Sequence, residues 1–150
     1  EFRRVLFRSD MNKVIKMCLI HDLGECFTGD IPTFDKTKAD EQREEQLLRE
    51  WVDQLPSPFR EEMTALYQEM EARETVEAKI YKALDNLEAV IQHNESDIST
   101  WADHEYELQR TYGNDKVQFS EYLKTLRQEV LEETEEKIFT AVYAQMNSYK

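Results

Sequence analysis

The chain has 150 residues, a formal net charge of −13 and 40% hydrophobic residues. This length suits one compact domain with an apolar core. The negative charge excludes a general nucleic-acid binder, because a phosphate backbone requires a cationic surface. No apolar run approaches the roughly 20 residues needed to span a bilayer, so no membrane-embedded role is expected. Cys18 and Cys26 follow no secretory signal and are expected to be reduced core residues, which predicts a cytoplasmic protein.

The N-terminus is unusual. Residues 1–9 read EFRRVLFRS, which matches the translation of a common short-read sequencing adapter. We therefore interpret them as an artefact and exclude them from the fold prediction. The natural sequence is then expected to begin near Asp10, with one or more preceding helices missing. The alternative is a genuine basic arm.

Composition favours helices throughout, since only three Gly and three Pro occur while 34% of residues are charged. The first element is predicted from Met11 to Phe27, where apolar residues cover most of the helical circumference. Such a pattern indicates a buried central helix. Gly29 and Pro32 are predicted to end it, followed by an ordered loop that carries Asp30.

Further helices are predicted from apolar residues at helical spacing. They cover residues 38–55, 59–70 and about 76–91, with Pro56 and Pro58 between the first two. The pattern weakens over 94–117, where a shorter packed element and a turn at Gly113 are expected. A long amphipathic helix follows from about Phe119, and its end is expected to protrude or to contact a partner. The prediction is an all-α bundle of about five to six helices.

His21 and Asp22 are the first candidates for chemistry. Consecutive residues diverge by about 100° on a helix, so the pair can meet at one ion only near a helix end or with reaching side chains. Taken alone, they are better explained as a hydrogen-bonded core histidine and a helix-terminal acid. Glu25, however, falls on the same helical face, and Asp30 follows on the loop. A divalent cation would satisfy these carboxylates and a neutral imidazole together, so the cluster predicts a metal site.

Asp85 is the best-placed acid for a distant third ligand. Lys82 precedes it by three residues and Glu88 follows it by three, so an exposed helical ion pair is the alternative. Local sequence alone slightly favours the ion pair.

Two segments resemble a known family. Residues 21–33 read HDLGECFTGDIPT, which resembles HD-x-x-E-x-x-x-GD-[IL]-P, the first motif of the 5′-deoxynucleotidase group of HD-domain phosphohydrolases. Residues 77–85 read EAKIYKALD and resemble the group's second motif, a helix with Lys three residues before a metal-binding Asp. The resemblance covers residues 10–95. It implies that His21, Asp22 and Asp85 bind a divalent metal ion such as Mn²⁺ or Co²⁺, that Glu25 is the catalytic acid/base residue for the attacking water, and that Asp30 contacts the substrate sugar.

The resemblance also implies an HD-domain helical bundle that hydrolyses deoxynucleoside 5′-monophosphates, and a homodimer. Members of the group carry a further metal-binding His and an Arg-Trp pair on an earlier helix. Neither is found here, which we attribute to truncation, and the truncated chain can be inactive for that reason. Lys36 and Lys82 are expected to be solvated or ion-paired, and His93 and His104 to be surface residues.

Two other functions stay open from the sequence. The first keeps the HD fold and changes the substrate to another nucleotide or a phosphorylated metabolite. The second is an inactive, acidic helical interaction module in which His21 and Asp22 are structural.

Overall fold

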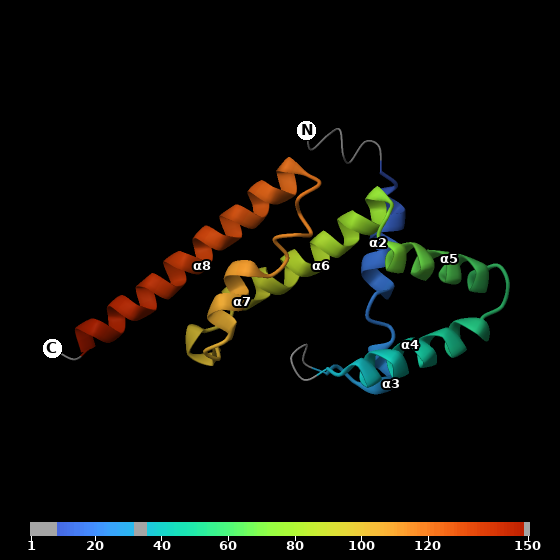
Figure 1. Cartoon of the computed structure of the whole chain (residues 1–150), viewed down its shortest axis with the longest axis horizontal. Coiled ribbons are helices and arrows are strands. Elements are labelled where there is room, and N and C mark those ends of the chain that lie inside the picture. Colours follow the sequence, from blue (N-terminus) through green and yellow to red (C-terminus); the bar gives the residue numbers. More distant parts are fainter. Residues whose placement is uncertain (1–8, 32–35, 149–150) are drawn as a thin grey trace. The chain divides into compact units, whose positions relative to one another are not determined.

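The computed structural model describes residues 9–31 and 36–148, without the side chains of Gln145 and Ser148. Every element in these ranges is helical (Figure 1), which confirms the predicted all-α class. Contacts divide the chain into an N-terminal unit, Asp10–Tyr81, and a C-terminal unit, Lys82–Lys150. That both belong to one HD domain stays a prediction. The adapter interpretation of residues 1–9 and the role of Pro32 fall almost entirely outside the described residues.

The N-terminal unit begins with α2 (Met11–Ile20). Asp10 caps it, because its carboxylate accepts hydrogen bonds from the backbone N–H groups of the second and third helical residues at 3.0 and 3.2 Å. The helix stops at Ile20, and turns occupy residues 21–24 before the short helix α3 (Glu25–Thr28). Gly29 ends α3 at φ 82°, and its N–H donates to the Glu25 carbonyl at 2.7 Å, so its predicted role as a helix terminator is confirmed.

The prediction of one buried helix through Phe27 is wrong. Val14 and Met17 are buried, but Ile15 and Leu19 are 53% and 75% exposed, and Phe27 is 42% exposed. Within the described residues, α2 therefore buries one side of its apolar surface and leaves the other side exposed. Cys26 is also exposed rather than in the core, although both cysteines are free as predicted.

Two longer helices complete the packing around α2 and α3. They are α4 (Lys38–Asp53) and α5 (Phe59–Ala72). Helix α4 contacts both α3 and α5, and α2 contacts α5. The buried apolar residues of α4 and α5 are Val52, Leu66 and Met70. Both helices lie close to their predicted ranges.

Helix α6 (Val76–Glu95) carries the chain from the N-terminal into the C-terminal unit. The C-terminal unit continues with a 3₁₀ turn (Ile98–Thr100), α7 (Glu105–Thr111) and α8 (Glu121–Ser148). Its apolar core contains Ala83, Leu87, Val117 and Leu123, most of which the helical spacing predicted. None of the helices in the described part of the chain is both long enough and apolar enough to cross a membrane.

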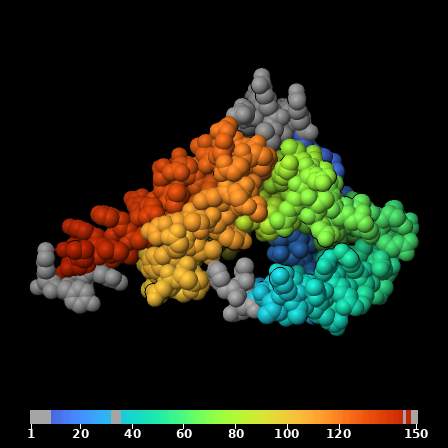
Figure 2. Space-filling model, in the orientation of Figure 1, coloured from blue at the N-terminus to red at the C-terminus, as the bar shows by residue number. Residues whose placement is uncertain are grey.

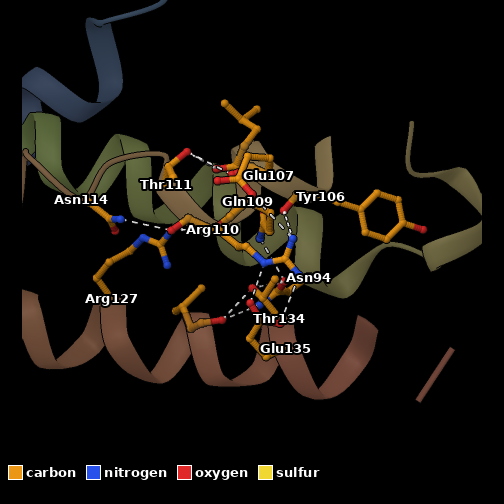
Figure 3. Close-up of polar contacts among 12 residues, drawn as sticks. Asn94, Tyr106, Glu107, Gln109, Arg110, Thr111, Asn114, Arg127, Thr134 and Glu135 are labelled. Atoms are coloured by element: carbon orange, nitrogen blue, oxygen red, sulfur yellow. Dashed lines mark hydrogen bonds and ion pairs between the residues drawn. The ribbon is translucent and has the colours of Figure 1, made fainter. Parts of the chain in front are cut away.

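A buried arginine connects α7 and α8 (Figure 3). Arg127 is 3% exposed, and its guanidinium donates to the carbonyls of Gln109 at 2.7 Å and Tyr112 at 3.0 Å. Burial lowers the pKa of the Arg127 guanidinium. The side chain therefore stabilises the end of α7 and the turn after it through carbonyl groups, which would otherwise be buried without a donor.

Polar side chains also connect α6 with α7 and α8. The Gln109 side-chain amide donates to Asn94 Oδ1 at 2.9 Å, and the Thr134 hydroxyl donates to the same oxygen at 2.9 Å. His93 stacks on Trp101 with ring centroids 4.3 Å apart, and its Nδ1 lies 3.2 Å from Gln109 Oε1. The expectation that His93 is an ordinary surface histidine is therefore wrong, because an aromatic ring and an amide enclose it. His104 is exposed, as expected.

Replacing Arg127 with Met is expected to lower the free energy of unfolding by about 3 kcal/mol, because two buried carbonyls lose their donor. The measurement is urea unfolding of the whole chain, followed by the fluorescence of Trp101 in a Trp51→Phe background, which leaves one tryptophan. The control is Arg110→Met. Arg110 pairs with Glu135 at 2.6 Å on a half-exposed surface, so its loss should cost less than about 1 kcal/mol. Equal losses in the two variants would contradict the role given to Arg127.

Candidate active site

His21 and Asp22 lie at the end of α2, where the helical divergence between consecutive residues no longer separates them. His21 is the C-cap residue, and its Nε2 lies 3.1 Å from Asp22 Oδ2. The Glu25 N–H donates to the Asp22 carbonyl at 3.0 Å, which closes the turn between α2 and α3. The structure therefore brings the first two predicted ligands together at a helix end, one of the two possibilities that the sequence allowed.

The second ring nitrogen of His21 is held by the backbone. Nδ1 lies 2.8 Å from the Cys18 carbonyl oxygen, which can only accept a hydrogen bond, so Nδ1 carries a proton. In the neutral imidazole, Nε2 then keeps its lone pair and directs it toward the Asp22 carboxylate. The ring is further oriented by the edge of Tyr81, at a centroid distance of 6.2 Å. A lone pair facing a carboxylate is stabilised only by a shared proton or a shared cation.

The geometry of this pair fits a metal ion. Two donors bound at right angles to one ion, each at about 2.1 Å, lie about 3 Å apart. The observed separation of 3.1 Å between His21 Nε2 and Asp22 Oδ2 matches that value. Among residues 9–31 and 36–148, however, no group of three or more His, Cys, Asp or Glu side chains is gathered so as to hold an ion. The pair therefore fits two positions of a coordination shell and does not complete it.

Glu25 begins α3 beside this pair, with a side chain that is 26% exposed. Burial, followed by the charges of Asp22 and Asp30, raises the pKa of the Glu25 carboxyl, and Lys36 opposes the rise. The acids predicted to act together are thus close enough to repel one another. Turns interrupt the helix at residues 21–24, so His21, Asp22 and Glu25 do not belong to one continuous helix as the sequence predicted. A carboxyl with a raised pKa is suited to exchanging protons near neutral pH.

Lys36 lies between two carboxylates. Its Nζ is 2.7 Å from Glu44 Oε2 and 3.7 Å from Glu25 Oε1. Its hydrogen bond to Glu44, and then the charges of Glu44 and Glu25, hold the pKa of Lys36 above its ordinary value. The prediction that Lys36 is ion-paired is confirmed. Glu44 was missed, because nothing in the sequence distinguishes it from Glu45 on the same helix.

Asp85 belongs to the C-terminal unit, on α6. Its Oδ2 lies 2.7 Å from Lys82 Nζ, so the ion pair that the local sequence favoured is present. Burial, together with the charge of Asp85, raises the pKa of Tyr112 in the same unit. The role of Asp85 as a metal ligand stays a prediction.

Tyr67 fixes the end of α2 from the neighbouring helix α5. Its hydroxyl donates to the Ile20 carbonyl at 2.8 Å, one residue before His21. Burial raises the pKa of Tyr67 to about 12. The sequence gave no indication of this hydrogen bond.

Comparison with known proteins supplies a family. A family model described as HD domain matches residues 4–127. The chain is 33% identical over 90 residues to the 5′-deoxynucleotidase HDDC2 of Homo sapiens, covering 59% of this chain and 44% of that protein. The protein of the same name from Danio rerio is 39% identical over 85 residues, covering 55% of this chain and 42% of the relative. The one from Dictyostelium discoideum is 32% identical over 120 residues, covering 79% and 58%. The chain thus spans about two fifths to three fifths of the length of these relatives, and no solved structure matches it significantly.

Tyr67→Phe is expected to lower the free energy of unfolding by about 1 kcal/mol at pH 8, because the Ile20 carbonyl loses the hydrogen bond from the Tyr67 hydroxyl and keeps the one from the Leu23 N–H. The phenol ionises near pH 10 in the unfolded chain and near pH 12 in the fold. Its stabilising contribution is therefore complete below pH 10 and is lost as the pH rises through about 12. Urea unfolding is followed by circular dichroism at pH 8 and at about pH 11. The difference in unfolding free energy between the unmodified chain and Tyr67→Phe should be smaller at the higher pH. A difference that stays constant over this range would contradict the assignment.

Proposed function

The chain belongs to the HD-domain family, and from that premise we propose a metal-dependent phosphohydrolase that acts on deoxynucleoside 5′-monophosphates. Water would attack the phosphorus atom, the bond from phosphorus to the 5′ oxygen would break, and deoxynucleoside and phosphate would leave. The observation that carries the proposal is the convergence of His21 Nε2 and Asp22 Oδ2 beside Glu25, within the first motif. Relatives named 5′-deoxynucleotidase support this choice of substrate.

In this proposal, His21 and Asp22 supply two ligands to a divalent ion such as Mn²⁺ or Co²⁺, and Asp85 supplies a third. The assignment of Asp85 rests on the second sequence motif, in which Lys82 precedes it by three residues. HD-domain phosphohydrolases depend on metals. When bound, such an ion lowers the pKa of a coordinated water and offsets phosphate charge.

Glu25 is the proposed acid/base residue. Its carboxylate would take a proton from the attacking water and return one to the 5′ oxygen of the leaving deoxynucleoside. The raised pKa of Glu25 supports both roles, because the group then accepts and releases protons closer to neutral pH. Asp30, one residue after Gly29, would accept a hydrogen bond from a sugar hydroxyl with its exposed carboxylate.

A second candidate is an inactive helical module. The pairs His21–Asp22 and Lys82–Asp85 can each act as structural ion pairs, and that observation favours a module without a bound metal. An HD phosphohydrolase for a ribonucleotide or a phosphorylated metabolite is a further alternative, which changes the substrate alone.

We also propose that two copies associate through the end of α8. This stretch displays four large apolar side chains that are 49–69% exposed, and its surface is the red end of the chain in Figure 2. They are Phe139, Val142, Tyr143 and Met146. Residues 139–147 contain no charged side chain, so two copies can meet there without opposing like charges, despite the net charge of −13.

The two free cysteines support the predicted cytoplasmic location.

The activity is tested by phosphate release from deoxynucleoside 5′-monophosphates, measured on the chain after chelation and addition of Mn²⁺ or Co²⁺. Glu25→Gln is expected to lower kcat at least about 100-fold, because proton transfer to and from the reacting oxygens is lost. Glu45→Gln is the matched control, with the same charge change at an exposed position paired with Arg49. Activity that persists in chelator, or that is unaffected by Glu25→Gln, would contradict the proposal. Faster release from ribonucleotides would change the substrate and keep the mechanism.

Equilibrium dialysis against Mn²⁺ separates enzyme from module without using turnover. His21→Ala should weaken binding at least about tenfold, because Nε2 is one of the proposed ligands. Absence of binding by the unmodified protein would favour the structural module.

For self-association, sedimentation equilibrium of the unmodified chain is expected to give a dimer, and Phe139→Glu a monomer. Thr140→Glu introduces the same charge at the next position, away from the apolar face, and should leave the dimer intact. A monomeric unmodified chain, or equal effects of the two substitutions, would contradict this interface.

A further inference from the structure

Three side chains from separate segments of the N-terminal unit meet beside the proposed acid/base residue. Lys36 lies between Glu25, which begins α3, and Glu44 in α4. The side chains of Glu25, Lys36 and Glu44 are 26%, 19% and 18% exposed. Lys36 is nearer to Glu44, at 2.7 Å, than to Glu25, at 3.7 Å. Glu44 is therefore the main partner of the Lys36 ammonium, and the positive charge of Lys36 also acts on the Glu25 carboxylate.

Lys36 and Glu44 belong to one rigid segment. Lys36 directly precedes Thr37, the N-cap of α4, and Thr37 forms a capping box with Asp40. The Thr37 N–H donates to Asp40 Oδ2 at 2.9 Å, and the Asp40 N–H donates to Thr37 Oγ1 at 3.3 Å. These bonds fix the backbone where the chain enters the helix. The capping box thus fixes the backbone between Lys36 and Glu44 independently of their contact with Glu25.

Glu44 also packs against the backbone that carries Glu25. Gly24 is buried, and a Cβ placed on it would lie 2.6 Å from Glu44 Cγ and 2.9 Å from Glu44 Oε1. The backbone of Gly24 has φ −59°, which any residue adopts, so a larger residue here would displace the Glu44 side chain rather than strain the backbone. The Glu44 side chain therefore fills the space that a side chain at position 24 would need.

We propose that Glu44 is a positioning residue that holds Lys36 against Glu25 and so fixes the orientation of the Glu25 carboxylate. The inference rests on the proposed acid/base role of Glu25. A carboxylate that transfers protons must be aimed at the reacting oxygens, and an ordered rotamer removes the entropic cost of finding that orientation. The opposing possibility is that Lys36 contacts the substrate phosphate directly.

Kinetics separate these two roles. If Glu44 acts through Lys36, then Lys36→Met and Glu44→Gln should each lower kcat about tenfold with little change in KM. The double variant should lose no more than either single variant, because both substitutions break the same contact. Lys36→Arg should retain most activity, and Glu45→Gln should be unchanged. A raised KM with unchanged kcat in Lys36→Met would assign Lys36 to the substrate and overturn the proposal.

Gly24→Ala tests the same contact without changing any charge. The added methyl group would displace the Glu44 side chain, so kcat should fall as in Glu44→Gln. In a Glu44→Ala background the space is free, and Gly24→Ala should have no further effect. Additive losses would mean that Gly24 acts independently of Glu44.

A measurement on the unreacting protein keeps the proposal testable if turnover is absent. Side-chain NMR relaxation of Glu25 and of the Lys36 ammonium should show ordered groups in the unmodified chain. Both should become more mobile in Glu44→Gln and stay ordered in Glu45→Gln. An inactive protein with this mobility pattern would reject the proposed function and retain the positioning contact. Unchanged mobility in Glu44→Gln would overturn the positioning role, whatever the activity.

Discussion

The site depends on the termination of α2 at Ile20. On a helix, consecutive residues such as His21 and Asp22 point about 100° apart, so they can share an ion only near a helix end or with reaching side chains. At this end of α2 their side chains approach to 3.1 Å. The hydrogen bond from the Tyr67 hydroxyl occupies the Ile20 carbonyl, and the Cys18 carbonyl binds His21 Nδ1. Carbonyl groups in the last turn of the helix thus accept hydrogen bonds from side chains around the site.

The helices follow from sequence periodicity, but the interruption at residues 21–24 does not. Apolar residues continue through the break, and Gly24 alone is a weak signal because single glycines occur within helices. The burial of α2 was also overestimated. Periodicity shows which residues can be buried, but Ile15 and Leu19 are exposed in the structure. Terminators with a local physical cause, such as Gly29 at positive φ, were predicted correctly.

Polar contacts between separate helices could not be predicted from the sequence. The ion pair of Lys82 with Asp85 could be anticipated, since residues three apart on a helix are neighbours. Glu44 and Glu45 look alike in the sequence, and only the packing of α3 against α4 makes one of them a buried partner of Lys36. Arg127 belongs to a helix rich in charged residues, and its burial follows from carbonyls presented by a different element.

The charges around Glu25 are compatible with the cation proposed to bind at His21 and Asp22. Of the charged groups in the described part of the chain that act most strongly on its carboxyl, Asp22, Asp30 and Glu44 are negative and Lys36 is positive. Lys36 is already paired with Glu44, so its charge offsets only part of the repulsion. Glu25 and Glu44 are partly buried carboxylates, whereas Asp22 and Asp30 are exposed. A divalent ion held by His21 and Asp22, as proposed, would offset part of the negative charge near Glu25.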